Sequence, residues 1–282
     1  MTGKTTRTWL ITGADKGLGY STAKAALESG DRVVVTVLAS DGGHPLTKQY
    51  PDRFKAIHLN ALDQDRIASV VDEAQRSFGS IDVLVNNAGY GLLGVAEENT
   101  PDQYRPLFEV HFFAAVEMTR AVLPGMRRNR SGHIINLSSV AGFAGSGGFC
   151  FYSAAKFAIE GFSEALAKEV KPLGIHVTII EPGAFRSDFA GPSLAAHQCK
   201  IADYAPVLGE RIKHYIASRH GHQPNDPAKF GPVLCKIVNS DAPPLRLPLG
   251  EDGLKIVRDK LAQVAAEVDL WQELSRSTTA DA

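Results

Sequence analysis

Tyr152 and Lys156 stand four residues apart at the start of a stretch with helical spacing, at about 152–170. This spacing places both side chains on one face of a helix, one turn apart. The phenol of a free tyrosine has a pKa of about 10, too high for efficient proton transfer near neutral pH. A neighbouring ammonium favours the phenolate and lowers that pKa. The pair is therefore a candidate general acid/base, although the same spacing also occurs in ordinary exposed pairs on helices.

A glycine-rich turn near the N-terminus is the second feature that could carry chemistry. Gly13, Gly17 and Gly19 lie between an apolar run at 8–12 and an amphipathic stretch at 18–28. Glycines at a strand–turn–helix junction let a pyrophosphate approach the backbone at the start of the helix. Their G-x-x-x-G-x-G spacing differs from the commoner G-x-G-x-x-G, and glycines also end strands for purely structural reasons. In this context the turn favours a dinucleotide-binding site.

Short β-branched runs alternate with longer amphipathic stretches over the first two-thirds of the chain. This alternation predicts right-handed crossovers and a mainly parallel sheet. The strands are apolar almost throughout, which fits burial on both faces. We therefore predict an α/β fold, a single Rossmann-type doubly wound parallel sheet with helices on both faces. The expected strands are 8–12, 32–37, 54–59, 81–85, 133–137 and 176–180, and the expected helices are 18–28, 67–78 and about 152–170.

The chain has 282 residues, and no linker or internal repeat divides it. Because α/β folds often reach about 250 residues as one unit, we expect a single dinucleotide-binding catalytic domain over 1–282. The periodicity breaks down at about 184–225, which is too long for a simple connection and predicts a pocket or lid segment. Helical spacing returns at about 252–274, which predicts a C-terminal helical extension.

The composition excludes several classes of protein. Thirty basic and thirty-one acidic residues give a net charge of −1, so no nucleic-acid partner is expected. No apolar stretch approaches the roughly 20 residues of a membrane helix, and no membrane partner is expected. Three unpatterned cysteines argue against a disulfide framework and against a metal site. These features favour a cytoplasmic protein.

Five motifs together resemble the classical short-chain dehydrogenase/reductase family. The resemblance covers about residues 7–250, and the motifs come in the family's order and at its usual spacing. It implies a Rossmann fold and hydride transfer with a nicotinamide cofactor. The motifs are Thr12-Gly13-x-x-x-Gly17-x-Gly19, Asn86-Asn87-Ala88-Gly89, Ser138-Ser139, Tyr152-x-x-x-Lys156 and Pro182-Gly183.

The resemblance implies a catalytic role for each of four residues. Tyr152 would be the general acid/base, and Ser139 would hold the substrate oxygen by a hydrogen bond. Lys156 would bind the nicotinamide ribose and lower the pKa of Tyr152. His111 stands where the family usually has an asparagine, whose backbone carbonyl holds a water that relays protons to the lysine. His111 could keep that backbone role, donate a proton itself, impair the relay, or merely fill the space.

The same resemblance implies the cofactor contacts. They come from the glycine turn, from the end of the second strand and from loops after later strands. The residues are Gly13, Asp15, Lys16, Gly17, Leu18, Gly19, Leu38, Asn60, Ala61, Asn87, Ala88, Gly89, Tyr152, Lys156, Pro182, Gly183, Phe185 and Ser187.

The end of the second strand favours NADP(H) over NAD(H). An acid there would bind the ribose 2′-hydroxyl of NAD. Leu38 stands at this point instead, and Asp41 comes too late. Lys16 lies in the glycine turn, where it could face a 2′-phosphate. The alternative is that Lys16 is a solvated turn residue.

Aromatic and apolar residues dominate the positions that would form the substrate pocket. They predict an apolar or aromatic ketone, aldehyde or secondary alcohol, and so a ketoreductase of the carbonyl reductase or alcohol dehydrogenase type. The residues are Tyr90, Leu93, Ala141, Phe143, Phe149, Phe185 and Phe189.

Two alternative functions are an NAD-linked dehydrogenase of hydroxysteroid-like substrates and a cofactor-binding sensor without turnover. The complete set of Ser139, Tyr152 and Lys156 argues against the sensor.

Members of the family that the chain resembles are mostly dimers or tetramers that pair through the helices before and after the fifth strand. The resemblance therefore implies a homodimer or homotetramer.

Overall fold

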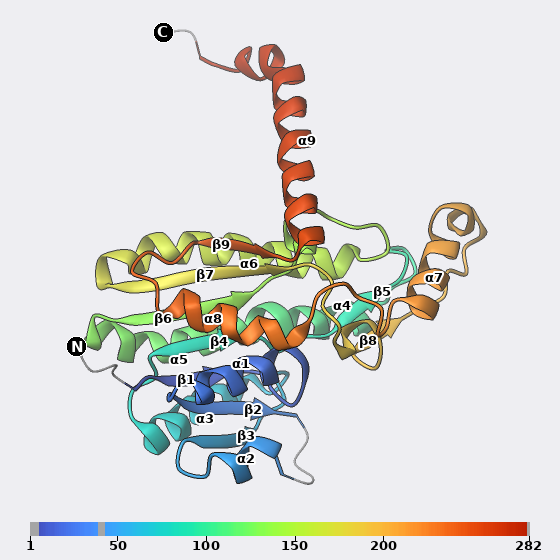
Figure 1. The fold of residues 1–282 in the computed structure, drawn as a ribbon. Helices are drawn as coiled ribbons and strands as arrows, with labels where there is room; N and C mark the ends of the chain where they lie inside the picture. The colour runs from blue at the N-terminus through green and yellow to red at the C-terminus, as the bar shows by residue number, and fades with distance from the viewer. Residues whose placement is uncertain (1–5, 39–42, 281–282) are drawn as a thin grey trace.

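A seven-stranded parallel sheet forms the centre of the protein, in the order β3-β2-β1-β4-β6-β7-β9. The structure is a computed structural model and describes residues 6–38 and 43–280. Figure 1 shows the sheet with helices around it, which confirms the predicted Rossmann-type fold. The strands are β1 Thr8–Ile11, β2 Arg32–Val37, β3 Phe54–His58, β4 Val83–Asn86, β6 Gly132–Leu137, β7 Ile175–Pro182 and β9 Arg246–Leu249.

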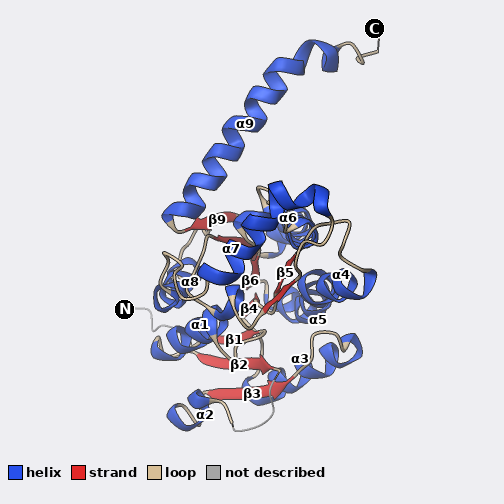
Figure 2. Cartoon of the chain, turned by 90° about the vertical axis from the view of Figure 1, so that its right-hand side faces the viewer, coloured by secondary structure: helices blue, strands red, loops and turns tan. Residues whose placement is uncertain are grey.

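Helices pack on both faces of this sheet, as the view in Figure 2 shows. One face carries α1 (Gly17–Glu28), α2 (Pro45–Gln49) and α8 (Phe230–Val238). The other carries α3 (Gln64–Phe78), α5 (Ala114–Asn129) and α6 (Cys150–Val170). The described part of the chain also contains α4 (Pro101–Phe108), α7 (Glu210–Ser218) and α9 (Glu251–Arg276). Within residues 6–38 and 43–280, no helix combines the length and apolar character that crossing a bilayer requires.

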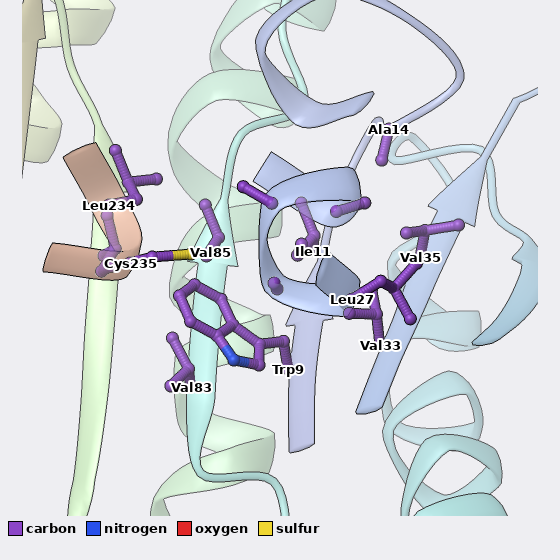
Figure 3. Packing of buried hydrophobic residues seen from close by; sticks show 14 of the residues in the cluster. Trp9, Ile11, Ala14, Leu27, Val33, Val35, Val83, Val85, Leu234 and Cys235 are labelled. Atoms are coloured by element: carbon purple, nitrogen blue, oxygen red, sulfur yellow. The ribbon is translucent and has the colours of Figure 1, made fainter. Parts of the chain in front are cut away.

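Both faces of the central strands are buried, because successive side chains point to opposite sides of the sheet. Trp9 and Ile11 of β1 pack toward α1 and α8, whereas Leu10 between them packs on the other face. Figure 3 shows this core, with Trp9 and Ile11 beside Val33 and Val35 of β2. The near-continuous apolar runs in the sequence reflect this double burial.

Parallel pairing brings the carboxyl ends of all these strands to one edge of the sheet. β1 lies between β2 and β4, so the chain turns to opposite sides of the sheet after β1 and after β4. Such a switch point leaves a crevice beyond the strand ends, where ligands of this architecture bind. The glycine turn, Asn87, Ser139 and Gly183 all follow strands at this edge.

Three strands have no counterpart among the predicted elements. β5 (Gly91–Leu93) and β8 (Leu194–Ala196) pair in parallel, which joins the 184–225 segment to the loop after β4. β9 contains Pro248 and pairs only with β7 at the edge of the described sheet, where a proline is tolerated. The predicted lid is mostly irregular and contains α7, and the predicted extension is α9.

Candidate active site

Ser139 and Tyr152 meet at the carboxyl edge of the sheet. Ser139 directly follows the loop after β6 and caps the short 3₁₀ turn Val140–Gly142, where its Oγ accepts a hydrogen bond from the backbone N of Ala141 (3.1 Å). Tyr152 lies in the first turn of α6 and is buried. The Ser139 hydroxyl lies close enough to the Tyr152 phenol to lower the pKa of that phenol. The structure therefore brings these two predicted residues together.

Lys156 lies one turn further along α6, inside the protein. Its Nζ donates a hydrogen bond to the carbonyl oxygen of Leu137, at the end of β6 (2.6 Å), and lies 5.8 Å from the centre of the Tyr152 ring. Burial lowers the pKa of Lys156 to about 7, although Glu160 opposes this change. Lys156 can therefore gain or lose a proton near neutral pH.

The pKa of Tyr152 differs from the expectation that Lys156 lowers it. Burial raises the pKa of Tyr152 above its ordinary value, and the hydrogen bond from Ser139 opposes that rise only in part. The Lys156 ammonium is directed to the carbonyl of Leu137 rather than to the phenol. Among the chain's own groups, therefore, Tyr152 is held as the neutral phenol, the form that donates a proton.

His111 is buried in the π-helical turn Glu109–Phe113, between α4 and α5. Its Nε2 lies 2.7 Å from the carbonyl oxygen of Tyr90 and 3.1 Å from the backbone N of the same residue. One ring nitrogen cannot donate and accept at once, and the shorter contact assigns Nε2–H as donor to the carbonyl. Nδ1 then has no hydrogen-bond partner among the described residues.

Electrostatics keep this histidine neutral. Burial holds the pKa of His111 well below its ordinary value, and the positive charge of Lys156 acts in the same direction. Its ring meets the Tyr152 ring edge-on, with centres 5.4 Å apart. The polar contacts of His111 in the described residues go to Tyr90, which assigns it to holding the loop after β4 in place.

The glycine turn fits a dinucleotide closely. Gly13 has a φ of +64°, and a Cβ there would lie 2.8 Å from Cα of Ala88. Asn87 Nδ2 donates to the carbonyl oxygens of Thr12 (2.8 Å) and Gly13 (2.7 Å), which joins the two loops. A Cβ on Gly19 would lie 2.5 Å from the same amide nitrogen. Neighbouring atoms of the protein thus exclude side chains at Gly13 and Gly19, which leaves this turn as bare backbone at the carboxyl edge of the sheet.

The residues around the end of β2 and in the glycine turn already make contacts within the protein. Leu38 is 63% exposed, and its backbone N donates to Asp15 Oδ2 (3.3 Å). Lys16 Nζ forms an ion pair with Asp188 Oδ2 (2.6 Å), which belongs to the lid segment. A 2′-phosphate would have to compete with Asp188 for Lys16. Asp41 lies outside the described residues.

The remaining predicted cofactor residues also lie at this edge. Asn60 is exposed, and its Oδ1 accepts a hydrogen bond from the backbone N of Leu62 (3.0 Å), while Ala61 packs on the core beside it. Ser187 caps the 3₁₀ turn Asp188–Ala190 through the backbone N of Phe189 (3.4 Å). The side-chain oxygen of Asn60 is thus already bound by the backbone of its own turn.

Pro182 ends β7 and Gly183 follows it, and Asp252 at the start of α9 holds the loop there. Asp252 Oδ2 accepts from the backbone N of Ala184 (2.8 Å), and its Oδ1 accepts from Asn225 Nδ2 (2.7 Å). A Cβ on Gly183 would lie 2.4 Å from Asp252 Oδ1. Sequence reasoning missed Asp252, since only the fold brings it to this loop.

An aromatic cluster surrounds Tyr152. The Phe189 ring lies 5.2 Å from the Tyr152 ring and the Phe149 ring lies 6.0 Å from it, measured between centres. Tyr90 and Ala141 pack in the same cluster. Four of the predicted pocket residues therefore gather around the phenol.

Three other predicted pocket residues lie elsewhere. The half-buried Phe185 packs its ring edge-on against Phe230 of α8, with centres 5.4 Å apart, beside the core cluster between α1 and the sheet. Leu93 is buried in a neighbouring cluster beneath α7. Phe143 ends the 3₁₀ turn after Ser139 and is half-buried.

Tyr215 of α7 is a residue that sequence reasoning missed. Its ring packs on Phe149, with centres 5.2 Å apart, and it contributes to raising the pKa of Tyr152. The helical spacing of Ile212, Tyr215 and Ile216 inside the lid segment was the available signal. The lid thus places a second phenol near the first.

The chain is similar to known proteins in sequence and in fold. A model described as short chain dehydrogenase matches residues 7–198, which is more than half of the chain. The chain belongs to the short-chain dehydrogenase family. As a member of it, the chain is an oxidoreductase, and the family uses NAD(P)(H).

Relatives of this short-chain dehydrogenase match over most of their length. A solved short-chain dehydrogenase from Streptomyces avermitilis is 39% identical and covers 99% of this chain and 100% of its own, with a TM-score of 0.91. Oxidoreductase BOA17 from Botryotinia fuckeliana is 33% identical over 96% of this chain and 98% of its own. A 3-ketodihydrosphingosine reductase from Bacteroides thetaiotaomicron is 36% identical over 86% of this chain and 87% of its own.

Lys156→Met should make stability less dependent on pH. The unfolded chain keeps the ordinary lysine pKa of 10.5, whereas the folded pKa is about 7. The cost of burying the ammonium is therefore complete below pH 7 and disappears as the pH rises toward 10.5. As the pH falls from 10.5 to 7, the free energy of unfolding of the variant should therefore rise relative to that of wild type. The gain should be of the order of a few kcal/mol, at about 1.4 kcal/mol per pKa unit. Urea unfolding across this range measures it.

Lys168→Met, on the exposed face of the same helix, is the matched control for this experiment. It should leave the pH profile unchanged. Parallel profiles for wild type and Lys156→Met would contradict the assignment of a lowered pKa to Lys156.

His111→Asn should keep turnover within about two-fold of wild type or raise it. An asparagine amide can donate to the carbonyl of Tyr90 as Nε2 does, and it removes the buried Nδ1 that lacks a partner. His111→Leu, which fills the space without a donor, is the control and should lower kcat. A several-fold loss of kcat in His111→Asn, with unchanged unfolding temperature, would instead show an active part for the imidazole.

Proposed function

We propose that the protein transfers a hydride between NADP(H) and an apolar or aromatic ketone, aldehyde or secondary alcohol. The observation that carries the proposal is the half-buried Ser139 next to the Tyr152 phenol, which is buried inside a cluster of aromatic rings. Both hydroxyls can hydrogen-bond one substrate oxygen, and the rings around them offer an apolar surface to the rest of the substrate. This arrangement supports a reaction of the carbonyl reductase or alcohol dehydrogenase type.

Each catalytic residue then has a role set by its surroundings. The nicotinamide cofactor, when bound, supplies or accepts the hydride at the substrate carbon. In reduction, the Tyr152 phenol donates its proton to the substrate oxygen, which develops negative charge, and Ser139 stabilises that oxygen by a hydrogen bond. Lys156, with a pKa of about 7, can supply a proton near neutral pH, and its return to Tyr152 after turnover requires a relay because Nζ contacts the carbonyl of Leu137. Oxidation of an alcohol uses the same groups in reverse.

The preference for NADP(H) rests on charge near the end of β2. Leu38 stands where an acid would bind a 2′-hydroxyl, and Lys16 supplies a cation in the glycine turn. Its ion pair with Asp188 is between half-exposed groups, so it stabilises by about 1 kcal/mol at most. A 2′-phosphate, with two negative charges, can therefore displace Asp188 from Lys16.

The substrate class rests on the aromatic cluster and on one relative. Phe149, Phe189 and Tyr215 reach Tyr152 or each other from α6 and from the lid. One relative is named as a reductase of 3-ketodihydrosphingosine, which is a ketone. We take an apolar ketone as the first substrate class to test.

We also propose a cytoplasmic homodimer or homotetramer that pairs through α5 and α6. Phe113, just before α5, and Phe157 on α6 are each 46% exposed, which fits burial against a second copy. Cys150 and Cys199 form no disulfide, which fits a reducing compartment.

A screen of apolar and aromatic ketones with NADPH and NADH tests the reaction. Wild type should oxidise NADPH with at least one class of ketone, and Tyr152→Phe should lower kcat by about 10²-fold or more, because the proton donor is lost. Tyr104→Phe, a stacked tyrosine of the same cluster, is the matched control and should stay active. Cofactor binding without turnover on every ketone, unchanged in Tyr152→Phe, would favour a sensor instead.

Lys16→Ala should raise the KM for NADPH several-fold and leave the KM for NADH almost unchanged. Asp188→Asn frees Lys16 from its ion pair and should lower the KM for NADPH. Steady-state kinetics with both cofactors measure the two effects. Equal effects of Lys16→Ala on both KM values would show that this lysine does not read the 2′-phosphate.

A further inference from the structure

The helix α9 projects away from the rest of the protein, as both ribbon views show (Figures 1 and 2). It is held at its root, where Gly253 is buried and Asp252 binds the loop after β7. Every residue from 261 to 280 is exposed. Most helical stability in proteins comes from packing of an apolar face rather than from propensity. An exposed helix of this length therefore calls for a partner.

The apolar side chains of α9 follow a heptad pattern. Their spacing alternates between three and four residues, which places them in one stripe, at the a and d positions of a coiled coil. Leu261 is 55% exposed, Val268 is 61% exposed and Trp271 is 58% exposed. The stripe consists of Leu254, Val257, Leu261, Val264, Val268 and Trp271.

The charges beside the stripe set the direction of pairing. The charged positions that flank the stripe are Glu251 at the start of α9, Arg258 and Lys260 further along its first half, and Glu267 in its second half. A parallel pair would place no opposite charges side by side at these positions, whereas an antiparallel pair can place Lys260 beside Glu267 of the second copy. We propose that α9 pairs antiparallel with α9 of a second copy of this chain.

A single register satisfies both the stripe and the charges. If Leu261 packs on Val264 of the second copy, then Val257 meets its Val268, and Leu254 meets its Trp271. Each a position thus faces a d position, and the two-fold axis repeats every layer. In this register the positions that flank the stripe bring Lys260 beside Glu267 of the second copy, twice by symmetry.

A parallel register has no such ion pairs. It would place Lys260 near Ala265 of the second copy, and Glu267 near its Gln272. The stripe also widens near the end of α9, where Leu270 and Leu274 are 75% and 64% exposed. In the antiparallel pair this end reaches the root of the second copy's helix, where it can pack on that copy's body.

The oligomeric mass of the full chain tests the surface. Leu261→Glu/Val264→Glu should lower the mass in solution by at least a factor of two, measured by light scattering after gel filtration. Ala266→Glu, on the opposite side of the same helix, is the matched control and should leave the mass unchanged. An unchanged thermal transition of the body shows that the variant is folded. Equal masses for wild type and the double variant would overturn the proposal.

Charge reversal tests the antiparallel register. Lys260→Glu and Glu267→Lys should each weaken self-association by about ten-fold or more in sedimentation, since each places like charges together. Lys260→Glu/Glu267→Lys should restore it, because the pair is only exchanged. Failure of the double variant to recover would overturn the register. A monomeric wild type that binds vesicles of phosphatidylcholine and phosphatidylglycerol through the stripe would overturn the pairing in favour of a membrane surface.

Discussion

The buried ammonium of Lys156 is the constraint on which the rest of the site depends. Its hydrogen bond to the carbonyl of Leu137 joins α6 to the end of β6, and so fixes Tyr152 against Ser139. Burying a charge is costly unless other groups compensate. Glu160, one turn along α6, acts on Lys156 in this sense, and Arg246 of β9 binds Glu160 (3.1 Å). Through Arg246 and Glu160, β9 at the edge of the described sheet therefore helps to stabilise the charge of Lys156.

The His111 ring occupies space that a neighbouring residue must leave free. Its ring fills the space beside Gly89, where a Cβ would lie 2.4 Å from Cε1. In the same way Asp252 fills the space beside Gly183. These two glycines are thus required by the protein's own side chains. At Gly13, by contrast, the positive φ and the neighbouring backbone impose the requirement.

The parts of the fold that could be predicted are those set by local pattern. Strands buried on both faces can be predicted from apolar runs in the sequence. The four-residue spacing of Tyr152 and Lys156 predicts that they share one face of a helix. β5 and β8 could not be predicted, because three-residue strands exist only through their pairing with each other. The packing of Phe185 on Phe230 depends equally on distant residues, and so does the direction of the Lys156 ammonium.

The two ends of the 184–225 segment meet at one point, beside the start of α9. Asn225 N donates to the carbonyl of Ala184 (3.1 Å), Arg186 N donates to the carbonyl of Asn225 (2.9 Å), and Asp252 binds both ends. The segment between them is a closed loop, and its interior reaches Tyr152 through Phe189. Because its ends are fixed on α9, residues inside the loop can change without moving β7. Ser139, Tyr152 and Lys156 lie outside this loop, on β6 and α6 and the turn between them, so changes inside the loop leave their backbone positions unchanged.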